Sequence, residues 1–205
     1  MRTRNEDATF VAELPGETVL AVVADGMGGH PAGDVASRIA VDTIKAAVDG
    51  VEVDPDGKLS ELLLAAHEAV LLTAASEPAY DGMGTTAVVS YVSNDRAHVA
   101  HVGDSRCYLI RDGSAAQLTR DHNEDGYLTQ ALGVRRPITP DSVLVDVRPG
   151  DRLLLCSDGL SGLVSDTAIG QLAAAGTLAD ACDRLVDAAL SAGGYDNVTV
   201  VLVEV

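Results

Sequence analysis

Apolar positions along the chain follow two different periods, and each period predicts a different kind of element. Unbroken or alternating apolar stretches predict strands over residues 18–24, 85–93, 96–102, 106–110, 142–147, 151–157 and 198–205. Helical spacing of apolar residues predicts helices over residues 32–48, 60–76, 165–175 and 177–192. The strands come in series and the helices in pairs, with few strand–helix–strand alternations. This order favours an α+β fold with antiparallel sheet over a doubly wound parallel fold.

Length and charge exclude several classes of protein. A chain of 205 residues without an internal repeat or a long linker suits one domain with a buried core. Its 31 acidic and 14 basic residues give a net charge of −17, which argues against binding nucleic acid or an anionic membrane. The apolar stretches are too short for a membrane segment, and the N-terminus does not resemble a signal peptide. Three cysteines without Cys-x-x-Cys spacing predict reduced thiols in a cytoplasmic protein, which we expect to be a monomer.

Several carboxylates fall where predicted strands end. Asp25 and Asp158 each follow a strongly apolar strand and lead towards a helix, and Asp104 also follows an apolar strand. Asp196 precedes the last strand, and Glu6-Asp7 lies near the start of the chain. A partly buried carboxylate is costly unless it is paired, and few Lys or Arg residues lie nearby in the sequence. Oxygen ligands select Mg²⁺, Mn²⁺ or Ca²⁺ over zinc, so the pattern predicts a hard-cation site. The alternative is a set of unrelated turn aspartates.

Seven short motifs occur over nearly the whole chain. They are Arg2-Thr-Arg-Asn-Glu-Asp7, Ala24-Asp-Gly-Met-Gly-Gly-His30, Gly82-Met-Gly-Thr-Thr86, Val102-Gly-Asp-Ser-Arg106, Leu118-Thr-Arg-Asp-His122, Ser157-Asp-Gly-Leu160 and Asp196-Asn-Val-Thr-Val200. Each is weakly specific alone, but in this order they resemble the metal-dependent serine/threonine protein phosphatases of type 2C, in their bacterial form. The resemblance implies a four-layer αββα fold, in which two antiparallel sheets lie face to face between pairs of helices.

The resemblance also implies a site for two Mg²⁺ or Mn²⁺ ions at one end of this sandwich. Carried over by motif, Asp25 bridges the two ions, and Asp158 and Asp196 complete the ligands of the first. The Gly26 carbonyl binds the second ion, and Glu6 acts on it through water.

Further residues are assigned by the same motifs. Asp7 and Asn197 are expected just behind the ligands. Asp104 matches the weaker third-metal site of bacterial members. Arg2 matches the arginine that grips the substrate phosphate, and it is therefore a candidate catalytic and substrate-binding residue.

The sequence suggests a chemical role for one histidine and structural roles for two others. His30 is the nearest candidate to donate a proton to the leaving alkoxide, although a role at the helix start or the site rim is the alternative. His98 and His101 lie on predicted strands and are interpreted as structural. His67 and His122 indicate no specific role.

By this resemblance the protein hydrolyses phosphoserine and phosphothreonine in proteins, through direct attack of a metal-bridging hydroxide on phosphorus. Its partner is then a phosphorylated protein, and it opposes a serine/threonine kinase. Two alternatives stay open. One is a catalytically weak type 2C fold that serves as a regulatory or binding module. The other is a phosphatase of an anti-sigma-factor antagonist or of a small phosphoester.

The sequence departs from the family at two places. Met1 directly precedes Arg2, where family members have a strand, so a missing first strand is expected, with Arg4 as an alternative phosphate contact. Only residues 123–127 separate His122 from residues 128–133, where family members carry a flap subdomain. We therefore expect residues 1–205 to form a single, reduced type 2C domain. Its more open site is expected to change substrate choice or to weaken retention of a third ion.

Overall fold

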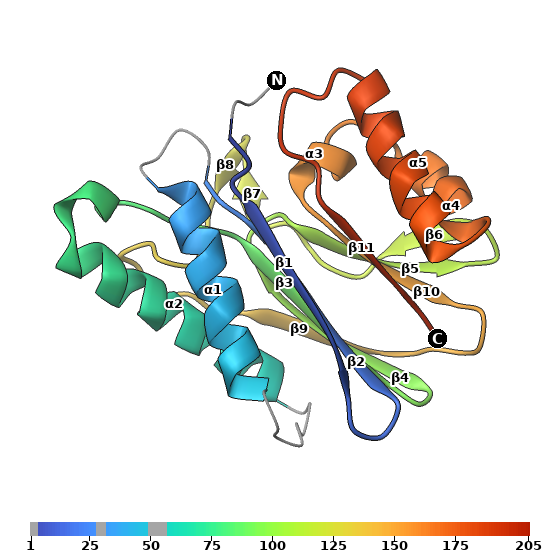
Figure 1. Ribbon diagram of the computed structural model, residues 1–205, viewed down its shortest axis with the longest axis horizontal. Helices are drawn as coiled ribbons and strands as arrows, with labels where there is room; N and C mark the ends of the chain where they lie inside the picture. Colours follow the sequence, from blue (N-terminus) through green and yellow to red (C-terminus); the bar gives the residue numbers. More distant parts are fainter. Residues whose placement is uncertain (1–3, 28–31, 49–56) are drawn as a thin grey trace.

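The computed structural model describes residues 4–27, 32–48 and 57–205. Two antiparallel sheets lie face to face, and one helix pair covers the outer face of each (Figure 1). This arrangement confirms the α+β class and the four-layer order implied by the motifs.

The first sheet has the strand order β1-β2-β3-β4-β9. Its strands are β1 (Asp7–Leu14), β2 (Thr18–Asp25), β3 (Ala87–Ser93), β4 (Arg96–Val102) and β9 (Asp141–Asp146). Helices α1 (Gly33–Val48) and α2 (Lys58–Ser76) pack on its outer face, and the short 3-10 turn η1 (Pro78–Tyr80) follows α2. In the described part of the chain, α2 alone has the length and hydropathy of a membrane span. Its buried residues pack in the core, as those of a core helix do.

The second sheet has the order β11-β10-β5-β6. It consists of β5 (Arg106–Arg111), β6 (Ser114–Gln117), β10 (Arg152–Cys156) and β11 (Val200–Glu204), and it is covered by α4 (Asp166–Ala174) and α5 (Leu178–Ser191). Ser165 and Thr177 cap these two helices, each accepting a hydrogen bond from the backbone of the first turn. The one-turn helix α3 (Asp158–Ser161) directly follows β10, and β7 (Asn123–Glu124) and β8 (Tyr127–Leu128) form a small separate hairpin.

Strand β2 shows why the central strands are apolar on both faces. Leu20 and Val22 pack towards α1 and α2, whereas Ala21 and Val23 pack against the second sheet. A strand buried on both faces reads as a continuous apolar stretch, which is why residues 18–24 were predicted correctly.

The structure adds strands that the apolar pattern did not predict. Strand β1 is an edge strand whose residues alternate between half-buried and exposed, so its sequence is too polar to stand out. The short strands β6, β7 and β8 were missed for the same reason. The helix predicted from residue 60 begins at Lys58 instead, after Gly57 in the left-handed conformation. The expectation of a missing strand before Arg2 concerns residues 1–3, which lie outside the described residues.

Candidate metal centre

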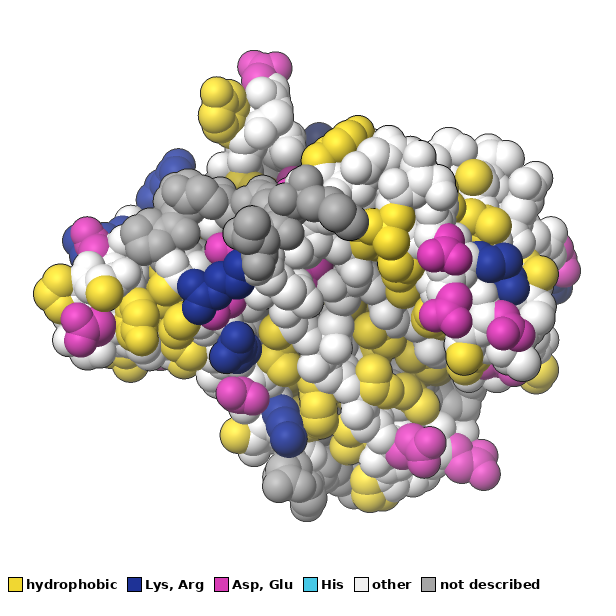
Figure 2. Space-filling model, turned by 45° about the horizontal axis from the view of Figure 1, so that its top comes forward, with side chains coloured by type: hydrophobic (Ala, Val, Ile, Leu, Met, Phe, Trp, Pro, Cys, Tyr) yellow, Lys and Arg dark blue, Asp and Glu magenta, His cyan; other side chains and the backbone are white. Residues whose placement is uncertain are grey.

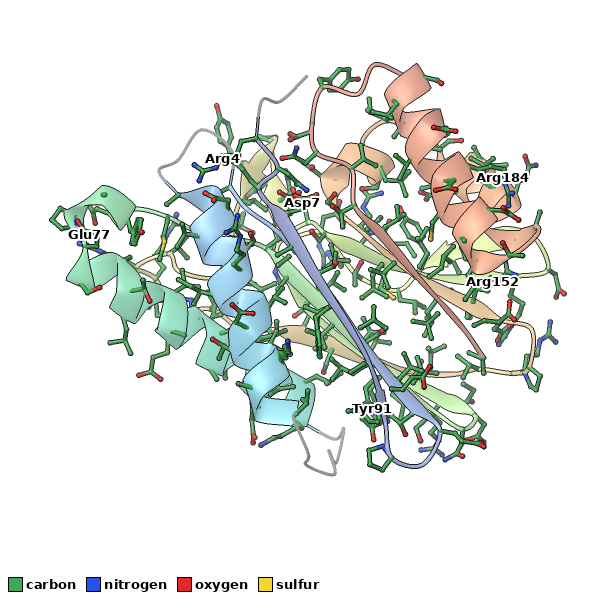
Figure 3. The ribbon with its side chains drawn as sticks, viewed as in Figure 1. Arg4, Asp7, Glu77, Tyr91, Arg152 and Arg184 are labelled. Atoms are coloured by element: carbon green, nitrogen blue, oxygen red, sulfur yellow. The ribbon has the colours of Figure 1, made fainter. Side chains whose placement is uncertain are left out.

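One end of the sandwich collects the carboxylates that the sequence placed at strand ends. Asp25 ends β2, and its direct partner across the sheet is Asp7 at the start of β1. Asp104 follows β4, Asp158 begins α3, and Asp196 lies in the loop before β11. Figure 3 shows Asp7 at this end, where side-chain oxygens from several segments gather.

An open cavity of about 470 Å³ lies between these segments. Four predicted ligands line it with their side chains: Asp25, Asp104, Asp158 and Asp196. The predicted backbone ligand Gly26 also lines it, beside Met27 and Thr86. The opposite wall comes from the β7–β8 hairpin. The space-filling view shows this hairpin standing out from the surface, with hydrophobic and acidic side chains at its tip (Figure 2).

Two threonines fix the backbone of Asp25. The Thr86 amide and the Thr85 hydroxyl both donate to the Asp25 carbonyl oxygen, at 2.9 and 2.8 Å. The Asp25 amide in turn donates to the Thr86 hydroxyl at 3.2 Å. Both threonines are buried, and they belong to the motif Gly82-Met-Gly-Thr-Thr86, which was recognised in the sequence without a role for its threonines. Their role is to hold a buried carboxylate at a fixed position.

The carboxylates at this end raise one another's pKa. Burial, followed by the charges of Asp7 and Asp158, raises the pKa of Asp25 well above its usual value. Burial, together with the charges of Asp104 and Asp196, raises the pKa of Asp158 to about 6. Asp25 and Asp158 are therefore costly to ionise in the absence of a counter-charge. A cluster of carboxylate oxygens with this electrostatic demand fits hard divalent cations.

Asp7 lies opposite Asp25 but is not among the residues that line the cavity. Its Oδ2 atom accepts hydrogen bonds from the Thr199 hydroxyl at 2.5 Å and the Ser157 hydroxyl at 3.0 Å. Its Oδ1 atom is buried and has no donor among the described residues. Burial raises the pKa of Asp7, against the effect of these two hydroxyls. Neither Ser157 nor Thr199 was assigned a role from sequence, although both lie within the quoted motifs.

Asn197 connects the two ends of the described chain. Its side-chain oxygen accepts from the Glu6 amide at 3.0 Å, and its side-chain amide donates to the Arg4 carbonyl at 3.1 Å. The Glu6 carbonyl accepts from the Gly26 amide at 3.0 Å. These bonds place Glu6 next to Gly26 by its backbone, although Glu6 is not among the residues that line the cavity.

Two glycines beside the carboxylates admit no side chain. A Cβ atom on Gly26 would lie 2.5 Å from the Glu6 carbonyl oxygen, and one on Gly159 would overlap the Asn197 carbonyl oxygen. Glycine at these positions lets the segments that carry Glu6, Asp158 and Asp196 approach one another.

Arg4 forms an ion pair that the sequence did not reveal. Its guanidinium lies 2.7 Å from the carboxylate of Asp34, a buried residue in the first turn of α1 (Figure 3 labels Arg4). Arg38 approaches the same carboxylate at 3.5 Å. The pair holds Arg4, the alternative phosphate contact, beside the start of β1. The other two predicted catalytic residues, Arg2 and His30, lie outside the described residues.

Comparison with known sequences places the chain among phosphatases. A family model described as protein phosphatase 2C matches residues 2–194. The serine/threonine protein phosphatase PstP of Mycobacterium tuberculosis is 37% identical over 226 residues, covering all of this chain and 43% of PstP. The serine/threonine phosphatase stp of Listeria monocytogenes is 36% identical over 232 residues, covering all of this chain and 91% of stp. The chain thus spans less than half of PstP but nearly all of stp.

Solved structures agree with the sequence comparison. Serine/threonine phosphatase Stp1 from Staphylococcus aureus matches with a TM-score of 0.93 and 30% identity, over all of this chain and 90% of Stp1. The catalytic domain of PstP, solved in complex with two manganese ions, matches with a TM-score of 0.89 and 34% identity, over all of this chain and 93% of that domain. Matches in sequence and in fold along the whole chain lead to one conclusion: the chain belongs to the protein phosphatase 2C family.

Proposed function

We propose that the protein is a Mg²⁺- or Mn²⁺-dependent phosphatase that removes phosphate from phosphoserine and phosphothreonine in proteins. The observation that carries this proposal is the convergence of Asp25, Asp158 and Asp196 on one cavity, where repulsion by acidic neighbours leaves Asp25 and Asp158 in need of cations. The two manganese ions in the PstP domain support the choice of metal.

The predicted site residues would have different roles in binding the ions. Asp25, at the end of β2, would hold both ions, with Asp158 and Asp196 on the first and the Gly26 carbonyl and Glu6 on the second. Asp7 would orient this set from behind, because Thr199 and Ser157 hold its other oxygen. The ions, when bound, neutralise the phosphate charge and lower the pKa of the attacking water. Asp104, beside Asp158, would serve a weaker third ion.

Two residues are proposed to handle the substrate: Arg2, which matches the family motif, and His30, which is the nearest histidine candidate in the sequence. Arg2 is proposed to grip the phosphate and His30 to supply the proton to the leaving oxygen. The protein is proposed to be a cytoplasmic monomer that acts on phosphoproteins and opposes a serine/threonine kinase. Two fully buried cysteines without a disulfide, Cys107 and Cys156, support a reducing compartment.

We also propose that residues 1–205 form one reduced domain whose flap is replaced by the β7–β8 hairpin. The alignments to PstP and stp span 226 and 232 residues, so both relatives carry residues that this 205-residue chain lacks. Replacing residues 123–128 with the flap of a relative should change the phosphopeptide preference or the metal requirement. If neither property changes, the hairpin is not a reduced flap.

Phosphate release from a phosphothreonine peptide with Mn²⁺ tests the function. Asp158→Ala should lower kcat/KM by about 10³-fold or more, because a metal site supplies several kcal/mol to the transition state. EDTA should abolish the activity of the parent protein. Asp187→Ala, on the exposed side of α5, is the matched control and should keep full activity.

Activity that survives both EDTA and Asp158→Ala would contradict the metal mechanism. A parent protein that binds Mn²⁺ but releases no phosphate would favour the binding-module alternative.

A further inference from the structure

His122, which the sequence left without a role, is held by two strands of the first sheet. His101 on β4 and Asp141 on β9 are direct partners across those strands. The His101 ring stacks on the His122 ring with centroids 4.7 Å apart and planes 24° apart. The carboxylate of Asp141 lies 3.3 Å from His122 Nε2. His122 itself is almost fully buried.

The hydrogen bonds of His122 fix its tautomer. The Gly103 amide donates to His122 Nδ1 at 3.2 Å, and a backbone amide can only donate. Nδ1 therefore carries the lone pair and Nε2 the proton, and Nε2 is the ring atom that lies 3.3 Å from the Asp141 carboxylate. The His122 amide donates back to the Gly103 carbonyl at 3.0 Å. Both backbone polar groups of Gly103 are thus bound by one residue.

This tautomer argues against a metal site formed by His101, His122 and Asp141. His101, His122 and Asp141 offer ligand atoms within 4.8 Å of one another, a composition found in transition-metal sites. A metal on His122 Nε2 would require the proton to move to Nδ1, where it would oppose the Gly103 amide. The three residues are better explained as a packed support for the turn at Gly103 than as a metal site.

The contacts of His122 lead to Asp104, a carboxylate that lines the cavity. Gly103 has a φ of +106°, and a Cβ there would lie 2.5 Å from the Thr86 side chain, so this turn is tightly confined. The next residue, Asp104, lines the cavity and accepts a hydrogen bond from the Asn123 side chain at 3.1 Å. His122 therefore fixes the backbone just before Asp104, while its neighbour Asn123 fixes the Asp104 carboxylate.

We propose that His122 and Asp141 are positioning residues that hold Asp104 in place for a divalent cation, with His122 acting through the Gly103 amide. The inference rests on the proposed function, because it takes Asp104 as a metal ligand. His122 and Asp141 act on the position of Asp104 through the turn at residues 103–104, because the contact of His122 is with the backbone of Gly103.

The experiment measures Mn²⁺ binding directly, from the electron paramagnetic resonance signal of free Mn²⁺, and then repeats the titration by activity. Asp104→Asn first identifies the binding event that depends on this carboxylate. His122→Gln removes the acceptor from the Nδ1 position and should weaken that same event about fivefold, the effect of losing one hydrogen bond. His122→Asn keeps an acceptor at the Nδ1 position and should stay within about twofold of the parent.

A second pair of variants tests the far end of the support. Asp141→Ala removes the carboxylate that holds the His122 ring from the Nε2 side and should weaken the Asp104-dependent event about two- to threefold, less than the direct loss of a hydrogen bond. Asp146→Ala, exposed on the same strand, should have no effect. The KM for p-nitrophenyl phosphate at saturating Mn²⁺ should stay unchanged in the variants of His122, Asp141 and Asp146, whereas the Mn²⁺ concentration for half-maximal activity should follow the binding data.

Mn²⁺ binding by His122→Gln that equals that of the parent would overturn the proposal. The proposal would also be overturned if His122→Gln and His122→Asn lost Mn²⁺ affinity equally and in proportion to their loss of thermal stability. The absence of any Asp104-dependent binding event in the parent would also overturn it. If the proposed function is wrong, the parent protein will bind Mn²⁺ without releasing phosphate. This result differs from each of the results that would overturn the role of His122.

Discussion

Asp7 and Asp25 lie directly opposite each other, as partners across strands β1 and β2 at the end of the sandwich. Two like charges at opposed positions of a sheet destabilise it, and here burial adds to the penalty. Charge repulsion also acts on Asp158, because its neighbours Asp104 and Asp196 are acidic. The fold thus gives up some stability where its chemistry is carried out.

The first prediction concerns the stability of the metal-free protein. The folded pKa of Asp158, about 6, lies above its ordinary value of 3.8, so the folded state binds the proton more tightly than the unfolded state does. Its contribution to the free energy of unfolding therefore falls as pH rises from about 4 to about 6. In EDTA at pH 7.5, Asp158→Asn should be more stable than the parent by roughly 1 kcal/mol or less, because water screens the charge of this exposed residue, and this gain should shrink at pH 4.5.

Urea denaturation in EDTA at the two pH values provides the measurement. Saturating Mn²⁺ is the control, because it should reverse the order and leave the parent the more stable protein. A metal-free Asp158→Asn protein that is less stable than the parent at pH 7.5 would show that the carboxylates do not repel one another as described.

The second prediction concerns Gly159, where a side chain would overlap the Asn197 carbonyl. Gly159→Ala should lower the free energy of unfolding by about 2 to 3 kcal/mol, because the backbone next to Asp196 must move. It should also weaken Mn²⁺ binding. Gly57→Ala is the matched control: no atom lies within 4 Å of its added Cβ, so it carries only the cost of its left-handed φ of +77°, roughly 1 kcal/mol. Equal losses in the two variants would contradict this account.

The third prediction concerns the hydroxyl of Thr199, which donates to Asp7 at 2.5 Å. Thr199→Val keeps the shape of the side chain but removes the donor, so Asp7 loses one of the two hydroxyls that orient it. The affinity for Mn²⁺ should fall about threefold, less than the roughly tenfold loss expected on removing a direct partner of a metal ligand, because Asp7 itself lies behind the ligands. Thr199→Ser restores the hydroxyl and should restore most of the affinity in the same titration. A Thr199→Val protein with parent affinity would show that Asp7 needs no such support.

The fourth prediction concerns Tyr127 on the β7–β8 hairpin. It lines the metal cavity with its side chain 78% exposed, so it is placed to contact the residues that flank a phosphorylated side chain. Tyr127→Ala should raise the KM for a phosphothreonine peptide about fivefold, the loss of one aromatic contact, and leave the KM for p-nitrophenyl phosphate unchanged. Leu72→Ala, similarly exposed on α2, is the control and should change neither value. A parallel rise for both substrates in Tyr127→Ala would assign the residue to the metal site instead.

Apolar patterning predicted the elements that are buried on one or both faces, such as β2, β10 and α1, because burial imposes a period on the sequence. It missed β1, whose half-exposed residues carry no comparable signal, although β1 delivers Asp7 to the site.

By itself, the sequence determined which carboxylates stand at the ends of apolar strands, and the order of its motifs determined the family. Only the tertiary structure decided that Asp7 faces Asp25, that Thr199 supports Asp7, and that Asp141 supports His122. The physical reason is that periodicity reports burial along one segment. The partners of a buried charge, and with them its pKa, come from segments up to 192 residues apart that the fold alone brings into contact.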